Sequence, residues 1–206
     1  MKRMLWFLLL TMALPWAAFA NSVDFTNLGG KLSGSSAGLS LAGSMLIAIN
    51  GPKGLFTGDL GSVTFSTGGL SIGSLQLGGT FNSGGSFVIS GNGTDGIPNG
   101  VIFSGTFLGP VTWTLITLTN GTHNYTLTGT LTGSWFTGQM VNGAVVQLTV
   151  NTGNAFFSSS ATLSSGNTDF SGSGLRIAST PEPGSVFFFG TGVVSMAGLL
   201  RRKLKR

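Results

Sequence analysis

The 206-residue sequence contains no cysteine and one histidine, and only 7% of its residues are charged. Without cysteine, disulfide bonds, thiolate metal sites and thiol redox chemistry are excluded. A typical domain is about 25% charged, and disordered chains usually combine high charge with low hydrophobicity. The composition therefore predicts a folded chain with few groups suited to acid–base catalysis.

The formal net charge of +5 comes from the two ends of the chain. Between residues 21 and 180 the acidic and basic residues nearly balance, with Lys31, Lys53 and Arg176 against Asp24, Asp59, Asp95 and Asp169. A nucleic-acid interface needs a basic patch in the folded domain. The overall basicity therefore gives no support to nucleic-acid binding.

Residues 1–20 are typical of a secretory signal peptide. Lys2 and Arg3 precede an apolar stretch over residues 4–16, and Ala18-Phe19-Ala20 has the small-x-small form of a cleavage site. The stretch is too short for a transmembrane helix. We expect export through the Sec translocon and cleavage after Ala20.

The last 26 residues have three parts in a fixed order. Pro181-Glu182-Pro183 comes first, an uncharged apolar run over residues 186–200 follows, and the chain ends in basic residues. As a helix the run is about 22 Å long, and the flanking residues bring it near a minimal membrane span. The basic end predicts a cytoplasmic C-terminus. Its stop-transfer residues are Arg201, Arg202, Lys203, Lys205 and Arg206.

This tripartite segment resembles the PEP-CTERM sorting signal. The resemblance covers residues 181–206, and it implies a Gram-negative bacterium that makes exopolysaccharide. It also implies that an exosortase-type membrane enzyme recognises Pro181, Glu182 and Pro183 and cleaves nearby. An uncleaved single-span anchor is the alternative. A GPI signal fits less well, because its tail would not end in basic residues.

Residues 21–163 are expected to form one exported all-β domain, and residues 164–180 a tether. Glycine accounts for 35 residues, and Ser and Thr alternate with Phe, Leu, Ile and Val. No stretch between residues 50 and 180 has a helical apolar period. We expect eight to eleven strands in a single antiparallel β-sandwich or flattened barrel. A β-solenoid is the second interpretation, although no strict repeat length is present.

The clearest local signal is a hairpin around Asn120-Gly121. Segments 111–119 and 123–137 alternate apolar and polar residues, and Asn-Gly favours a two-residue type I′ turn. In the second arm the expected buried face carries Tyr125 and Trp135. The other face carries Thr126, Thr128, Thr130, Thr132 and Ser134.

Elsewhere the boundaries are less clear. Residues 45–49 are the firm strand candidate in the first part of the domain, before a turn at Asn50-Gly51-Pro52. The apolar positions change parity across Gly73-Ser74, which indicates a β-bulge.

No catalytic residue is assigned. Two segments, 34–38 and 69–73, match the nucleophile-elbow pattern G-x-S-x-G, but neither precedes a helix as that elbow requires. His123 lies just past the hairpin turn. A glycosidase needs two carboxylates roughly 5–9.5 Å apart, and no spacing suggests such a pair.

Two further features are weak binding candidates. Segment 90–97 is similar to one calcium-binding nonapeptide with Asp95 as the acidic ligand, but a single copy supplies half a site, and no metal or cofactor is assigned. The Thr row on the hairpin is either a hydroxyl surface for sugar or ice, or an ordinary solvent face. Trp113, Tyr125 and Trp135 fall on apolar faces, which favours packing over sugar stacking.

The sequence thus predicts an exported, non-enzymatic protein of the cell surface or exopolysaccharide matrix, with a structural or adhesive role. A carbohydrate-binding module is the alternative, and a matrix polysaccharide hydrolase is the third hypothesis. The expected partners are the translocon, the sorting enzyme, the membrane through residues 186–200 and exopolysaccharide.

Overall fold

Residues 22–171 are the part of the chain that the computed structural model describes, and they contain twelve strands in one antiparallel sheet. The only helical turn in this part is the 3₁₀ turn η2, Thr94–Gly96. The strands are β1 Asp24–Leu28, β2 Lys31–Ser35, β3 Gly38–Gly51, β4 Gly54–Ser66, β5 Leu70–Ser74, β6 Gly78–Phe81, β7 Gly84–Asn92, β8 Asn99–Phe107, β9 Val111–Thr117, β10 His123–Trp135, β11 Met140–Asn151 and β12 Ser160–Asp169.

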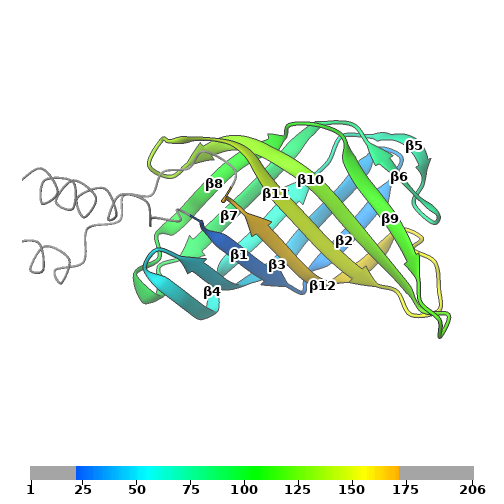
Figure 1. Ribbon diagram of the computed structural model, residues 1–206, viewed down its shortest axis with the longest axis horizontal. Helices are drawn as coiled ribbons and strands as arrows, with labels where there is room; N and C mark the ends of the chain where they lie inside the picture. Colours follow the sequence, from blue (N-terminus) through cyan, green and yellow to red (C-terminus); the bar gives the residue numbers. More distant parts are fainter. Residues whose placement is uncertain (1–21, 172–206) are drawn as a thin grey trace, which may run out of the picture. The chain divides into compact units, whose positions relative to one another are not determined.

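The sheet closes on itself. Following the pairings from β1 through β3, β4, β7, β8, β10, β11 and β12 returns to β1. Shorter strands lie end to end in this ring: β1 and β2 between β12 and β3, and β8 and β9 along β10. Figure 1 shows the strands wrapped around a common interior. The expected all-β antiparallel class is confirmed, and the ring of pairings is that of a barrel.

Alternation of apolar and polar residues places the core inside the ring. In β10, Tyr125, Leu127 and Leu131 are buried, while Thr128 and Thr130 between them are exposed. This is the pattern of a sheet with one packed and one solvated face. The assignment of Trp113 and Tyr125 to the core is confirmed, and Trp135 is partly buried.

The expected number of strands and two expected boundaries were wrong. The structure contains more strands than the eight to eleven expected, because β1 and β2 lie in a Gly-rich region with little apolar alternation. Residues 164–169, expected in the tether, belong to β12, and the Phe170 side chain beyond it is fully buried. The turn expected at Asn50-Gly51-Pro52 lies at Pro52 and Lys53, one step later, because Asn50 still pairs with Leu55.

The hairpin of β9 and β10 is confirmed, but its turn is not type I′. A type I′ turn needs positive φ at both central residues. In the described part of the chain Asp95 is the only non-glycine residue with positive φ, so only Gly121, at φ 80°, meets this requirement. The Gly121 amide donates to the Leu118 carbonyl and the Leu118 amide to the Thr122 carbonyl, both at 2.9 Å. This is a three-residue loop closed by a left-handed glycine.

The change in the parity of apolar positions across Gly73-Ser74 comes from a turn, not from the expected β-bulge. Ser74 ends β5, and residues 75–77 connect it to β6. The Leu77 amide donates to Ser74 Oγ at 3.0 Å. Apolar residues on the two sides of the change therefore belong to different elements.

Among residues 22–171, no helix has the length and apolar character needed to cross a membrane. The helix expected over residues 186–200 and the signal peptide expected over residues 1–20 both lie outside the described residues.

Two aromatic clusters fill the interior. The phenylalanine cluster runs as a chain of ring contacts with centroid distances of 5.1–6.4 Å. Its members are Phe25, Phe65, Phe87, Phe103, Phe107, Trp135 and Phe170. The tryptophan–tyrosine cluster consists of Trp113 stacked on Tyr125 at 4.9 Å, with Phe157 against both rings.

Glycines let the packed strands approach each other closely. Gly105 of β8 and Gly133 of β10 are opposite each other in register. A Cβ on either would lie 2.2–2.3 Å from a backbone carbonyl oxygen of the partner strand. Glycine pairs of this kind bend a sheet at its corners. Gly105 and Gly133 therefore allow β8 and β10 to pair closely within the ring.

Candidate interaction surface

The residues assigned to sorting and processing lie outside the described part of the chain. They are Ala18, Ala20, Pro181, Glu182, Pro183, Arg201, Arg202, Lys203, Lys205 and Arg206. Their roles remain predictions from the sequence.

Neither G-x-S-x-G segment forms a nucleophile elbow. Segment 34–38 spans the end of β2, a two-residue turn and the first residue of β3. Segment 69–73 enters β5, and both strands pair with other strands instead of leading into a helix. The elbow needs a strand-to-helix turn to expose its serine. These segments therefore lack the geometry of a hydrolase nucleophile.

His123 has a packing role at the start of β10. Its side chain is 8% exposed, and Nδ1 lies 3.1 Å from Thr117 Oγ1 on β9. The ring stacks on Phe156 with a centroid distance of 4.3 Å and an interplanar angle of 16°. The Thr117 contact lies within the hairpin of β9 and β10, whereas the Phe156 contact joins this hairpin to the loop before β12. The observed contacts of His123 are therefore packing contacts.

Asp95 is exposed on η2, between β7 and β8. Thr94 N donates to Asn92 Oδ1 at 3.0 Å, and Asn92 Nδ2 donates to the Asp59 carbonyl at 2.8 Å. These bonds are those of a closed polar turn. Among residues 22–171, no three His, Cys, Asp or Glu side chains gather into a group suited to hold a metal ion.

The structure brings together two carboxylates that the sequence did not connect. Asp24 of β1 is opposite Asp169 of β12, and their side chains share a hydrogen bond. Burial, and then the charge of Asp169, raises the pKa of Asp24; the backbone amide of Ser171 lowers the pKa of Asp169. Hydrogen-bonded carboxyls are closer than the ~5 Å of a glycosidase pair. The first and last strands meet only when the sheet closes, so no local sequence signal marks this pair.

The Thr row of β10 is one part of a wider polar surface. Its central residue Thr128 is in register with Thr112 of β9 and with Gln147 of β11. Gln147 is in register with Asn167 of β12, which pairs in turn with Thr26 of β1. Figure 1 shows these five strands side by side. At about 4.8 Å per strand, the row is roughly 19 Å long.

A second row runs two residues away along the same strands. Thr114, Thr126, Thr149 and Ser165 are in register across β9, β10, β11 and β12. We call the two rows together the amide–hydroxyl face. It contains no charged residue, and the nearest acidic pair in register is Asp24 and Asp169 at its border.

The amide–hydroxyl face keeps its hydrogen-bonding groups free. Gln147 and Asn167 are exposed, and their amides have no hydrogen-bond partner among the described residues. By contrast, Asn151 and Asn124 at the end of the same strands bind each other at 2.7 Å. The sequence showed the alternation on each strand. It did not show that the strands place these side chains in common rows.

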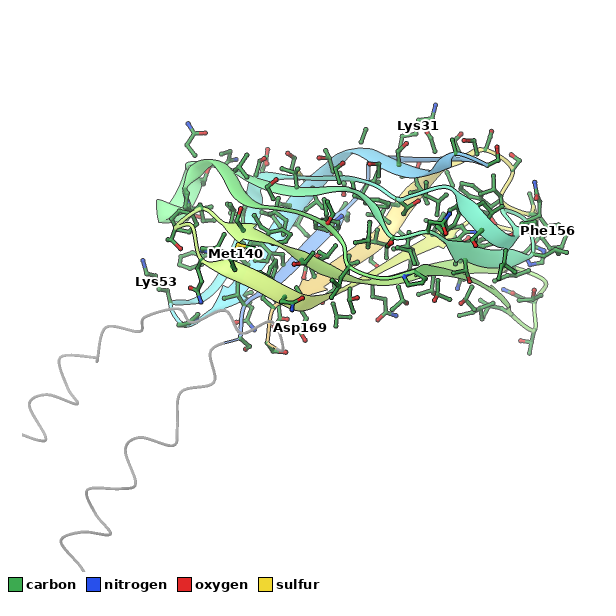
Figure 2. The ribbon with its side chains drawn as sticks, turned by 90° about the horizontal axis from the view of Figure 1, so that it is seen from above. Lys31, Lys53, Met140, Phe156 and Asp169 are labelled. Carbon is green, nitrogen blue, oxygen red and sulfur yellow. The ribbon has the colours of Figure 1, made fainter. Side chains whose placement is uncertain are left out.

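Within residues 22–171 the aromatic side chains do not form a stacking platform beside this face. Trp113 and Tyr125 are buried, and the aromatic side chains that are most exposed in the described residues are Phe136, at 53%, and Phe156, at 49%. Phe156 lies at one end of the sheet in Figure 2, and Met140, near Phe136 in sequence, lies toward the other.

Comparison of the chain with protein-family models, curated proteins and solved structures found no match.

Proposed function

We propose that this protein is an exported, non-enzymatic component of the cell surface or exopolysaccharide matrix of a Gram-negative bacterium. In this proposal the PEP-CTERM-like segment delivers it, and the amide–hydroxyl face contacts neutral polysaccharide. The single observation that carries the second part is the uncharged, in-register face with free amides at Gln147 and Asn167. Neutral glycans present hydroxyl groups that both donate and accept hydrogen bonds, which matches amide and hydroxyl side chains.

A broad adhesive contact fits these observations better than a discrete carbohydrate-binding module. Carbohydrate-binding modules commonly stack aromatic rings on sugars, whereas Trp113 and Tyr125 are buried in the interior and stack on each other. The amide–hydroxyl face offers many weak polar contacts along its length, and such contacts become effective when many act together. The hydrolase hypothesis is further weakened, because neither G-x-S-x-G segment precedes a helix.

Cosedimentation with insoluble polysaccharide tests the contact surface. The full chain should sediment with a neutral glucan. Asn167→Asp with Gln147→Glu should lose most of that binding, because the carboxylates cannot donate hydrogen bonds to glycan hydroxyls and would lose water at the contact without a positively charged partner. Thr64→Glu on β4 is the matched control, since Thr64 is also exposed on a strand of the same sheet. Equal binding by all three chains would exclude the amide–hydroxyl face. Binding to an anionic polysaccharide alone would exclude a neutral ligand.

The intact mass of the protein recovered from the surface of its host tests the delivery. We expect a chain that begins at Asn21 and ends near residues 180–183. Replacing Pro181, Glu182 and Pro183 with alanine should leave export intact and block the C-terminal cleavage. A surface protein that still ends at Arg206 would mean that the terminal segment is a permanent anchor.

A further inference from the structure

The closure seam, where β12 pairs with β1, needs a feature that fixes its register. β1 has five residues, and it places Thr26 opposite Asn167 and Asn27 opposite Gly166. A slip of β12 by two residues would leave its side chains on their present faces, so the alternation of apolar and polar residues does not exclude it. The backbone hydrogen bonds can also re-form after such a slip. The register of the seam must therefore depend on particular side chains.

A buried amide lies at this seam. The Asn27 side chain is 0% exposed, and its Nδ2 donates to Ser44 Oγ of β3 at 2.7 Å. Ser44 is also fully buried, and its hydroxyl donates in turn to the Leu28 carbonyl of β1 at 3.1 Å. These two hydrogen bonds hold the Asn27 side chain in one orientation inside the barrel.

Gly166 of β12 makes room for the Asn27 side chain. It is the only glycine in β12, and it lies directly opposite Asn27. A Cβ at Gly166 would lie 2.9 Å from Asn27 Cγ and would collide with Asn27 Oδ1. After a slip of two residues, either Ser164 or Thr168 would lie opposite Asn27, and each of them carries a Cβ. The side chain that Ser44 holds in place therefore fits one register of β12.

The same side chain has a cost in stability. Asn27 Oδ1 is buried and has no hydrogen-bond partner among residues 22–171. An unpaired buried acceptor destabilises a fold, and a leucine of similar shape would avoid this penalty. In coiled coils, a single buried asparagine specifies the register of the helices at a cost in stability. Specificity of register, and not stability, is thus the advantage that an amide offers at this position.

We propose that Asn27 is a closure latch: held by Ser44 and seated over Gly166, it makes β12 close the barrel in one register. The latch acts late in folding, because β1 and β3 are close in sequence whereas β12 is the last strand. Without the latch, a second closed form should appear in which β12 is shifted by two residues. The shift that places Phe25 opposite Gly166 is the favoured one, because a glycine there leaves room for the ring.

Pairs of introduced cysteines report the register, because the natural chain has no cysteine. Thr26→Cys with Asn167→Cys joins opposite positions, whose Cα atoms are about 4.5–5.5 Å apart, within the range of a disulfide. Thr26→Cys with Ser165→Cys joins diagonal positions about 7–8 Å apart, so this pair forms a disulfide only when β12 is shifted. Each pair is placed in the full chain, which is unfolded and refolded in a glutathione buffer. Intact mass after thiol alkylation gives the disulfide yield.

With Asn27 present, the pair at the opposite positions should form and the diagonal pair should not. Asn27→Ala should raise the yield of the diagonal pair relative to the opposite pair by at least about fivefold, the factor that corresponds to one net hydrogen bond. Leu163→Ala is the matched control, because it opens a cavity on β12 without removing a contact of Asn27, and it should leave the ratio unchanged. An equal rise in both variants would indicate a general loss of stability and overturn the latch.

Ser44→Ala tests the latch even where Asn27→Ala does not fold. It removes the hydrogen bond that orients Asn27 but little volume, so the chain should still close. The diagonal disulfide should again increase relative to the Leu163→Ala control. A ratio in Ser44→Ala equal to that of the chain with Ser44 would overturn the proposal, whatever the result for Asn27→Ala.

Discussion

The two aromatic clusters stabilise the interior in different ways. The phenylalanine cluster consists of hydrocarbon rings with one Trp, and its contacts are ring edges and faces. In the tryptophan–tyrosine cluster the polar groups of both rings form hydrogen bonds. The Trp113 indole N–H and the Tyr125 hydroxyl donate to loop carbonyls, and the Tyr125 hydroxyl accepts a hydrogen bond from Phe157 N at 3.0 Å. The first cluster stabilises the whole sheet, whereas the second mainly fastens two loops. Loss of a ring and loss of a hydrogen bond should therefore have different consequences.

The largest expected effect is in the phenylalanine cluster. Phe103→Ala removes a fully buried ring that packs against Phe87 and Phe170, and it should lower the free energy of unfolding by about 3–5 kcal/mol. Phe136→Ala, at a ring that is 53% exposed, is the control and should change it little. Denaturant unfolding of both variants measures the difference. Similar losses would mean that the interior is not the source of stability.

The Phe107 ring of the phenylalanine cluster leaves no room for a side chain at Gly129. A Cβ on Gly129 would lie 2.8 Å from the Phe107 ring and 3.3 Å from Val111. Gly129→Ala should therefore destabilise the fold by about 1–3 kcal/mol through overpacking. Adding Phe107→Leu should recover part of this loss in the same unfolding assay. An unchanged midpoint for the single variant would show that the neighbouring rings can move aside.

Tyr125→Phe isolates the hydrogen bonds of the second cluster. The ring contacts remain, but Gln76 O and Phe157 N lose their partner, at a cost of about 1–2 kcal/mol. Hydrogen exchange should accelerate in residues 75–77 and 155–159 and stay unchanged in β7 and β8. Uniform acceleration across the sheet would argue that this cluster also stabilises the whole fold.

The hairpin loop beside the second cluster gives a smaller effect. Gly121→Val forces a β-branched residue to a φ of 80° and should cost about 1 kcal/mol in thermal unfolding. Asn120→Val meets no such backbone strain and loses only the bonds from Thr122 to Asn120 Oδ1. Equal losses for the two variants would favour a type I′ turn after all.

The smallest expected effect on the free energy of unfolding is at the pair of Asp24 and Asp169. The pKa of Asp24 is raised in the fold. Protonated Asp24 therefore stabilises the fold at acidic pH, and this stabilisation is lost as the pH rises through the pKa of Asp24 in the folded state. Asp24→Asn should therefore stabilise the fold at neutral pH, by less than about 1 kcal/mol at this solvated site, and less at acidic pH. A gain that grows toward acidic pH would contradict this assignment.

The sequence predicted what depends on one strand or one turn. The buried and exposed faces of β10 followed from alternation, and the hairpin followed from Asn120-Gly121. It did not predict features that depend on register between distant strands. The amide–hydroxyl face, the Asp24–Asp169 pair and the role of β1 all require closure. The turn type was also missed, because Asn-Gly is compatible with both a type I′ turn and a longer loop that needs only one left-handed residue.

Closure by the first and last strands also has a kinetic meaning. Phe25 pairs with Thr168, so the ring cannot be completed until nearly the whole domain is available. Contacts between residues so far apart in sequence make folding slow, in the range of milliseconds to seconds for small all-β domains. Until its last strand is available, the domain would remain an open sheet with its β1 and β11 edges unpaired on the β12 side. If the chain is exported as proposed, these two edges would be the exposed surfaces of the domain during its transit.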